Sequence, residues 1–314
     1  MNSAEQQILP EPAAPAPFRT VEVPGAVLAV HRPASASEGA PAAADGRAPA
    51  LFVHGLGGSA ANWTALMDRL TGEVDAEAVD LPGFGHSAPP TDGNLSLSGH
   101  VRAVIGYLEA AGRGPVHLFG NSLGGAVSVR LAALRPDLVR SLTLVSPALP
   151  ELPPQRTAWP TGLLAVPGVP GLLRRLPAGE RDVERATDEL LRLVYGDPDG
   201  LPAATRAEAV AQYRRRLELP YAMQALVGSA RGIVSAYTER GDQALWRQAA
   251  RVTAPVLLVY GLRDRLVSYR SARRACAAFA DSRLLVLPDS GHVAMMEHPD
   301  AVAREVRELL SRTP

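Results

Sequence analysis

Lysine is absent from this sequence of 314 residues, so all 32 basic residues are arginine. They are matched by 32 acidic residues, and the formal net charge is zero. A chain without excess positive charge lacks the general basic field that attracts nucleic acids. We therefore expect no nucleic-acid partner.

Cysteine is almost absent, since Cys276 is the only one. A single cysteine excludes an internal disulfide, and it cannot form a cysteine-based zinc site. The sequence also lacks a glycine-rich phosphate-binding loop with its lysine, and no GxGxxG pattern follows the first buried strand. We therefore predict no metal and no cofactor.

Long apolar runs are absent too, because none reaches the roughly 18 residues of a membrane-spanning helix. Residues 1–17 carry acidic residues and prolines where a secretory signal needs a basic start and an apolar core, so we expect a disordered tail and a cytoplasmic protein. An apolar stretch at 161–177 is broken by prolines, which argues against a membrane anchor. Membrane association is therefore not expected.

Strands and helices alternate from residue 50 onward, which is typical of an α/β fold with a doubly wound, mostly parallel sheet and helices on both faces. Residues 18–33 precede this pattern and predict an antiparallel hairpin at a sheet edge. Strands are predicted at 50–55, 74–83, 116–120, 141–148, 254–261 and 282–292, and helices at 60–70, 95–111, 269–280 and 299–312.

The alternation stops between residues 147 and 251. This interval contains helical patterns at 180–195, 202–217 and 221–240 but no convincing strand. We interpret 147–251 as a helical cap inserted into a core formed by 18–146 and 252–314.

The segment 116–126, VHLFGNSLGGA, predicts a strand that turns sharply into a helix at Ser122. Such a turn strains the backbone, and the small residues Gly120, Gly124 and Gly125 relieve the crowding around it. This GxSxG pattern is a nucleophile elbow, which would hold the Ser122 hydroxyl clear of the fold. The alternative is an ordinary turn with a solvated serine.

A serine hydroxyl needs a base, and His292 is the candidate because it follows the last predicted strand. The imidazole in turn needs a carboxylate to orient it. Asp264, just after strand 254–261, is suitably placed, and the chain order Ser122, Asp264, His292 is the order expected for this elbow. Glu151 is a weaker rival for the acid.

An oxyanion formed at Ser122 needs two backbone donors. We predict that Leu123 N–H, directly after the serine, supplies one of them. The glycine-rich loop HGLGGS at 54–59 follows a buried strand and supplies the other through Leu56 N–H. Taken alone, this loop is also compatible with a simple connection between a strand and a helix.

Together these segments resemble the α/β-hydrolase fold family, and the resemblance extends over residues 18–314. The motifs that carry it are HGLGGS at 54–59, DLPGFGHS at 80–87, GNSLGG at 120–125, GLRD ending at Asp264, and the GH pair ending at His292. The resemblance implies that DLPGFGHS is a structural turn and that 147–251 is a cap over the active site. Apolar residues of the cap, Trp159 among them, are candidates to line an acyl pocket.

The elbow serine disfavours the dehalogenases and epoxide hydrolases of this family, which carry an aspartate there. We expect hydrolysis of a carboxylic ester of small or medium acyl length through an acyl-enzyme. One alternative is hydrolysis of carbon–carbon bonds in aromatic ring-cleavage products, although Val293 stands where such enzymes commonly have tryptophan. Another is a non-catalytic ligand-binding protein of the same fold.

Carbon–carbon hydrolysis would need an arginine in the pocket to hold the substrate carboxylate. The cap offers several, and their clustering at helical spacing predicts a solvated face rather than a pocket. They are Arg174, Arg175, Arg181, Arg214, Arg215 and Arg216.

Overall fold

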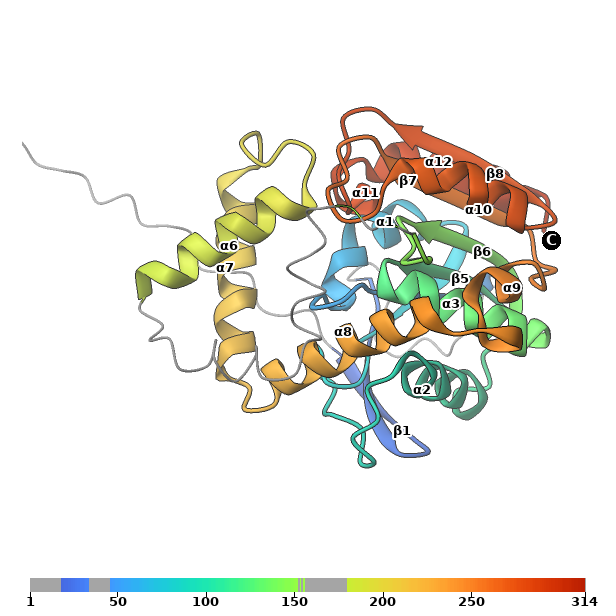
Figure 1. Cartoon of the computed structure of the whole chain (residues 1–314), viewed down its shortest axis with the longest axis horizontal. Coiled ribbons are helices and arrows are strands. Elements are labelled where there is room, and N and C mark those ends of the chain that lie inside the picture. Colours follow the sequence, from blue (N-terminus) through green and yellow to red (C-terminus); the bar gives the residue numbers. More distant parts are fainter. Residues whose placement is uncertain (1–17, 34–45, 152, 154, 156–179, 314) are drawn as a thin grey trace, which may run out of the picture.

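The structure is a computed structural model, and it describes residues 18–33, 46–151, 153, 155 and 180–313 (Figure 1). The predicted tail 1–17 lies outside the described residues, as do the apolar stretch 161–177 and Trp159. Side chains are described only from residue 183 onward in the last range.

Within the described residues the strands form one eight-stranded sheet in the order β1-β2-β4-β3-β5-β6-β7-β8. β1 pairs antiparallel with β2, β2 pairs antiparallel with β4, and all other neighbours are parallel. The strands are β1 (Phe18–Val23), β2 (Ala26–His31), β3 (Ala48–Val53), β4 (Val74–Val79), β5 (Val116–Asn121), β6 (Val139–Val145), β7 (Val256–Gly261) and β8 (Ser282–Leu287). The predicted fold class and the edge hairpin are therefore confirmed.

The core forms on both faces of this sheet because side chains alternate along each strand. Leu51 and Val53 of β3 belong to one buried cluster, whereas Phe52 between them belongs to the other. Phe52 stacks on Phe119 of β5, its register partner, with ring centroids 4.1 Å apart. Strands buried on both faces explain why their sequences are apolar almost throughout.

Helices cover both faces. The first cluster includes α2 (Leu97–Ala110), α3 (Leu123–Leu134), α9 (Leu245–Ala249) and α10 (Ala272–Ala278), and the second includes α1 (Thr64–Arg69), α11 (Ala294–Glu297) and α12 (Pro299–Ser311). As its spacing predicts, α12 begins at Pro299 and buries Val302, Val306 and Leu309. The short helices α9 and α11 were not predicted.

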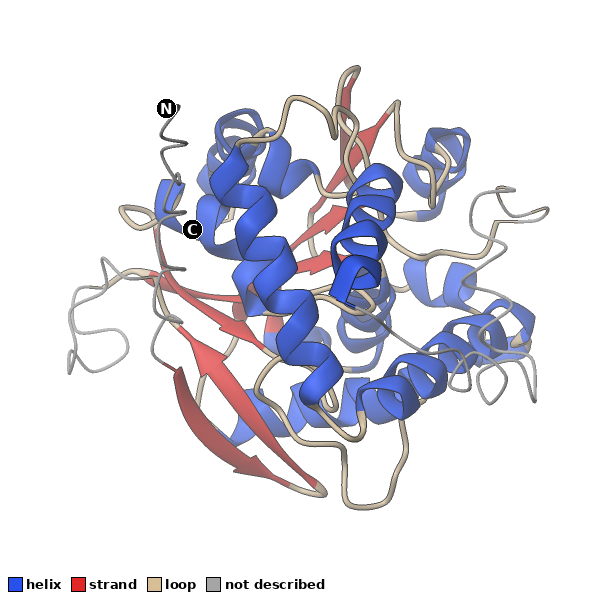
Figure 2. Cartoon of the chain, turned by 90° about the vertical axis from the view of Figure 1, so that its left-hand side faces the viewer, coloured by secondary structure: helices blue, strands red, loops and turns tan. Residues whose placement is uncertain are grey.

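The inserted interval contributes α6 (Glu180–Val194), α7 (Ala203–Glu218) and α8 (Ala222–Thr238) as well as α9. α6 and α7 pack against each other to one side of the sheet (Figure 1). Arg206 joins them through an ion pair of 2.7 Å with Asp188. In Figure 2 this side faces the viewer, and the β1–β2 hairpin lies at the lower margin of the sheet.

The later part of the interval packs directly on the core. α8 contacts α2, and α9 contacts α3. Arg130 of α3 is buried, and its Nε donates to Gln248 of α9 over 3.0 Å while its guanidinium pairs with Glu239 after α8. α8 and α9 are thus held to the core by a buried polar network.

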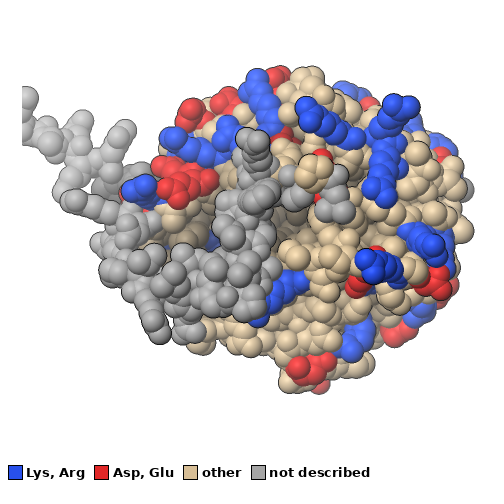
Figure 3. Space-filling view, in the orientation of Figure 1, with Lys and Arg blue, Asp and Glu red and all other residues tan. Residues whose placement is uncertain are grey.

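Charged side chains of both signs are interspersed on the face seen in Figure 3, in keeping with the zero net charge. Within the part of the chain that the structure describes, no helix combines the length and apolar character needed to span a bilayer.

Candidate active site

Ser122 lies at the apex of a tight turn between β5 and α3. Its backbone has φ 53° and ψ −114°, a conformation that costs a non-glycine residue about 1–3 kcal/mol. The flanking glycines permit the turn, because a Cβ at Gly120 would lie 2.5 Å from the Gly124 carbonyl oxygen. A Cβ at Gly124 would lie 2.2 Å from the Val53 carbonyl oxygen. The structure therefore contains the predicted strand, turn and helix around Ser122, and the backbone strain lies at Ser122 itself.

Asp264 and His292, from the loops after β7 and β8, are in direct contact. Nδ1 of His292 lies 2.9 Å from Oδ2 of Asp264 and 3.2 Å from Oδ1. Oδ1 also accepts hydrogen bonds from the N–H groups of Leu266 and Val267, at 2.8 and 3.0 Å. This arrangement fixes the orientation of the imidazole ring and leaves Nε2 of His292 as the ring nitrogen that can accept a proton.

The charge state of Asp264 follows from these contacts. Burial by itself raises the pKa of this carboxyl, but the charge and hydrogen bond of His292, together with the Val267 N–H and the Ser146 hydroxyl, hold the pKa below its usual range. Asp264 is therefore ionised at neutral pH and can stabilise a protonated His292.

Asn121 connects the elbow to the histidine loop. Its Nδ2 donates to the carbonyl oxygen of His292 over 3.1 Å and to that of Val145 over 3.0 Å. Ser122 itself makes no side-chain hydrogen bond to His292 or to any other described residue. Catalytic hydrogen bonds are often looser without substrate and tighten in the complex.

The loop after β3 lies directly against Ser122. Gly58 N–H donates to the Gly55 carbonyl over 3.1 Å, and Gly57 has φ 72°, as in a type II turn. A Cβ on Gly55 would lie 3.0 Å from Cβ of Ser122. The amides of Leu56 and Leu123 donate to no acceptor among the residues described, so both are available to an oxyanion.

His54 holds this loop in place through hydrogen bonds at both ring nitrogens. Its Nε2 accepts the Leu81 N–H over 2.9 Å, so Nδ1 carries the proton and donates to the Gly55 carbonyl over 2.7 Å. Complete burial lowers the pKa of His54, which keeps the ring neutral. His54 thereby ties the glycine-rich loop to the DLPGFGHS turn.

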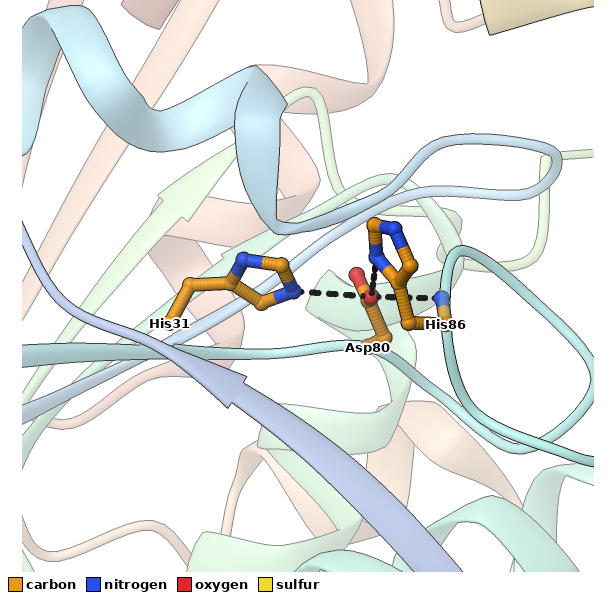
Figure 4. Close-up of side chains that lie close together, drawn as sticks. All are labelled: His31, Asp80 and His86. Carbon is orange, nitrogen blue, oxygen red and sulfur yellow. Dashed lines mark hydrogen bonds and ion pairs between the residues drawn. The ribbon is translucent and has the colours of Figure 1, made fainter. Parts of the chain in front are cut away.

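Asp80 anchors that turn (Figure 4). Oδ1 accepts the Ala60 N–H over 2.7 Å, while Oδ2 accepts the His86 N–H over 2.8 Å and lies 3.0 Å from Nε2 of His31. Side-chain atoms of His31, Asp80 and His86 lie within 4.8 Å of one another, a spacing that a metal ion can bridge. Because protein donors already occupy both carboxylate oxygens, we interpret Asp80 as a structural anchor.

Glu297 in α11 was missed by the sequence analysis. Its carboxylate accepts the N–H groups of Gly291 and Gly196, each over 2.7 Å. The His292 N–H donates to the carbonyl of Val194, at the end of α6, also over 2.7 Å. The loop that carries the histidine is therefore held by the inserted helices as well as by the core.

Glu151, the rival acid, does not bond to His292. Its Oε2 accepts the Ser268 N–H over 3.2 Å. Burial raises the pKa of Glu151, and the negative charge of nearby Asp264 adds to that effect although the Ser268 hydrogen bond opposes it. Among the described residues, Asp264 is thus the carboxylate that orients the imidazole.

The cap arginines do not all occupy a solvated face, and in this respect the prediction is wrong. Arg214 and Arg215 are exposed, but Arg216 is partly buried and its Nη1 donates to the Gly57 carbonyl over 2.8 Å. Successive side chains on a helix point about 100° apart, so three consecutive arginines meet different surroundings. Arg174 and Arg175, and the side chain of Arg181, lie outside the described residues.

The fold agrees with the comparisons. Residues 49–299 match the alpha/beta hydrolase fold, and the chain belongs to that family. An esterase of Mycobacterium tuberculosis is 30% identical over 84% of this chain and 84% of its own length. A pimeloyl-(acyl-carrier protein) methyl ester esterase of Neisseria meningitidis is 28% identical over 82% of this chain and 91% of its own length.

Other relatives carry different names. A 2-hydroxy-6-oxononadienedioate/2-hydroxy-6-oxononatrienedioate hydrolase of Cupriavidus pinatubonensis is 26% identical over 83% of this chain and 86% of its own length. A haloalkane dehalogenase of Bradyrhizobium elkani shares the fold with a TM-score of 0.76 at 21% identity, over 95% of this chain and 98% of that one. The chain spans only 65% and 59% of two dihydrolipoyllysine-residue acetyltransferase components, from Pseudomonas putida and Cupriavidus necator.

Proposed function

We propose that this α/β-hydrolase is a carboxylester hydrolase that uses Ser122, His292 and Asp264. The observation that carries the proposal is the buried His292–Asp264 pair, whose loop is bonded through Asn121 to the strained turn that presents Ser122. The substrate is a small-molecule ester of short to medium acyl length.

The reaction begins when Nε2 of His292 takes the hydroxyl proton and Oγ of Ser122 attacks the ester carbonyl. The N–H groups of Leu56 and Leu123 stabilise the negative charge that forms on the carbonyl oxygen. Collapse of this intermediate breaks the ester C–O bond, and His292 returns the proton to the leaving alkoxide. Water then attacks the acyl-enzyme by the same route and releases the carboxylic acid.

A second candidate is carbon–carbon bond hydrolysis. It is supported by the position of Arg216 beside the glycine-rich loop and by the relative from Cupriavidus pinatubonensis. We prefer ester hydrolysis because the alkoxide of an ester leaves after a single protonation by His292. A carbon leaving group must be protonated at carbon, which requires additional groups in the pocket. Ligand binding alone does not require an ionised Asp264 in contact with Nδ1 of His292, which argues against a non-catalytic binding protein.

The test compares p-nitrophenyl esters from acetate to hexanoate with a 2-hydroxy-6-oxo-dienoate on the wild type and on Ser122→Ala. We expect ester turnover, a loss of roughly 10⁴- to 10⁶-fold in kcat in the variant, and labelling of Ser122 by a fluorophosphonate. A dienoate kcat/KM a hundredfold above that of the best ester would favour the second candidate. Absence of turnover and of labelling would favour a binding protein.

A further inference from the structure

Arg216 has no role in the hydrolytic mechanism proposed above. It lies on α7, and Nη1 donates to the carbonyl oxygen of Gly57 over 2.8 Å. The planar guanidinium also stacks on the ring of Tyr213, 4.7 Å from its centroid. Two contacts in different directions hold the side chain in one orientation against the core.

No carboxylate lies within ion-pair distance of Arg216 among the residues that the structure describes. Its neighbours on α7 differ: Arg206 pairs with Asp188, and Arg214 lies 3.9 Å from Glu184. Burial lowers the pKa of Arg216, which reflects the cost of holding a cation away from water without an opposite charge. Arg216 is partly buried and has no opposite charge among the described residues, so its free N–H groups are available to an anionic ligand.

The position of Arg216 identifies that ligand as the substrate. Gly57 belongs to the turn that carries Leu56, the proposed oxyanion donor, and Gly55 in the same turn lies against Ser122. Leu226 of α8 also lies at Gly57, 3.5 Å from where a Cβ would be. A guanidinium beside an apolar side chain, on the loop that lies against Ser122, suits a substrate with an aliphatic body and an anionic end.

We propose that Arg216 binds a carboxylate on the substrate, so that the preferred substrates are monoesters of dicarboxylic acids. The proposal rests on the ester hydrolysis proposed above. One Nη1 hydrogen stays on Gly57, and the remaining N–H groups of the fork are those that pair with a carboxylate. Arg216 thereby determines specificity and takes no part in bond making or breaking.

The test uses pairs of methyl esters with equal acyl length, such as monomethyl adipate and methyl hexanoate, which differ only in the terminal carboxylate. For the wild type we expect kcat/KM to be about 10- to 100-fold higher for the anionic ester, the range of one charge-assisted contact. Arg216→Gln should lower kcat/KM for monomethyl adipate about 10- to 100-fold more than for methyl hexanoate, so that the preference disappears. Arg215→Gln is the matched control, since Arg215 is exposed on the same helix, and it should change neither value.

A second readout does not depend on turnover. Free adipate should bind to Ser122→Ala in calorimetry, and the additional change Arg216→Gln should abolish that binding. If Arg216 only fastens the cap to Gly57, the variant will lose activity equally on both esters and adipate will not bind, which overturns the proposal. Equal use of both esters by the wild type also overturns it and leaves ester hydrolysis intact, whereas hydrolysis of neither ester refutes the proposed function itself.

Discussion

The turn at 55–58 allows a direct test of the oxyanion hole through Gly55→Ala. The added Cβ would lie 2.8 Å from Oδ1 of Asn121 and 3.0 Å from Cβ of Ser122, whereas ordinary contacts begin near 3.4 Å. The loop must therefore retreat from the nucleophile by about half an ångström, and it carries the Leu56 N–H with it. Losing one oxyanion donor costs about 10²- to 10³-fold in kcat, so we expect a loss of that order with a smaller change in KM.

The assay is steady-state hydrolysis of p-nitrophenyl butyrate, with thermal unfolding measured in parallel. Gly72→Ala is the matched control, because no atom lies within 4 Å of its added Cβ, and it should keep full activity. Leu56→Pro provides a second variant that adds no Cβ beside Ser122. Proline is favoured at this turn position but has no N–H, so the same loss is expected with the fold intact. If either variant folds and keeps more than a third of wild-type kcat, Leu56 is not the oxyanion donor.

Two further predictions follow from the carboxylates. Asp264→Asn should lower kcat by about 10³- to 10⁴-fold, because an amide neither fixes the same tautomer of His292 nor stabilises its cation; a tenth of wild-type kcat remaining in stopped-flow assays would contradict this. Burial alone would raise the pKa of Asp80, but hydrogen bonds from His31 and His86 hold this pKa far below its usual range. The ionised Asp80 carboxylate therefore stabilises the folded state fully above about pH 4, and this stabilisation is lost as the pH falls below that value. Asp80→Asn should therefore reduce the free energy of unfolding in urea by about 3 kcal/mol or more at pH 7 and by less at pH 3, and an equal reduction at both pH values would refute this explanation.

The architecture could be predicted because it rests on periodicity and glycine. Strands such as β5 are apolar on both faces, and α12 spaces Val302, Val306 and Leu309 on one face, so both patterns are local. Boundaries were less accurate where tertiary contacts decide them. The strand predicted over 74–83 ends at Val79, because the chain turns after Asp80: the Leu81 N–H donates to Nε2 of His54, and the Leu81 carbonyl accepts the Phe84 N–H.

The candidate site was predictable for residues that sit at strand ends in a fixed order along the chain. Residues that act through backbone groups of distant segments leave no such pattern. Asn121 donates to a carbonyl 171 positions away, and Glu297 accepts an N–H from a residue 101 positions away. Arg216 is one of three consecutive arginines, and only the packing of α7 on the glycine-rich loop distinguishes it from Arg215.

The bond between His292 N–H and the Val194 carbonyl also has a consequence for protein engineering. Gly196, two residues further on, has no room for a side chain, since a Cβ there would lie 2.1 Å from the Asp289 carbonyl oxygen. A chimera that takes the interval 147–251 from another family member therefore needs to keep the native residues 194–196 within it. Grafts that keep these three residues should exchange substrate range, whereas grafts that replace them should lose turnover for every substrate.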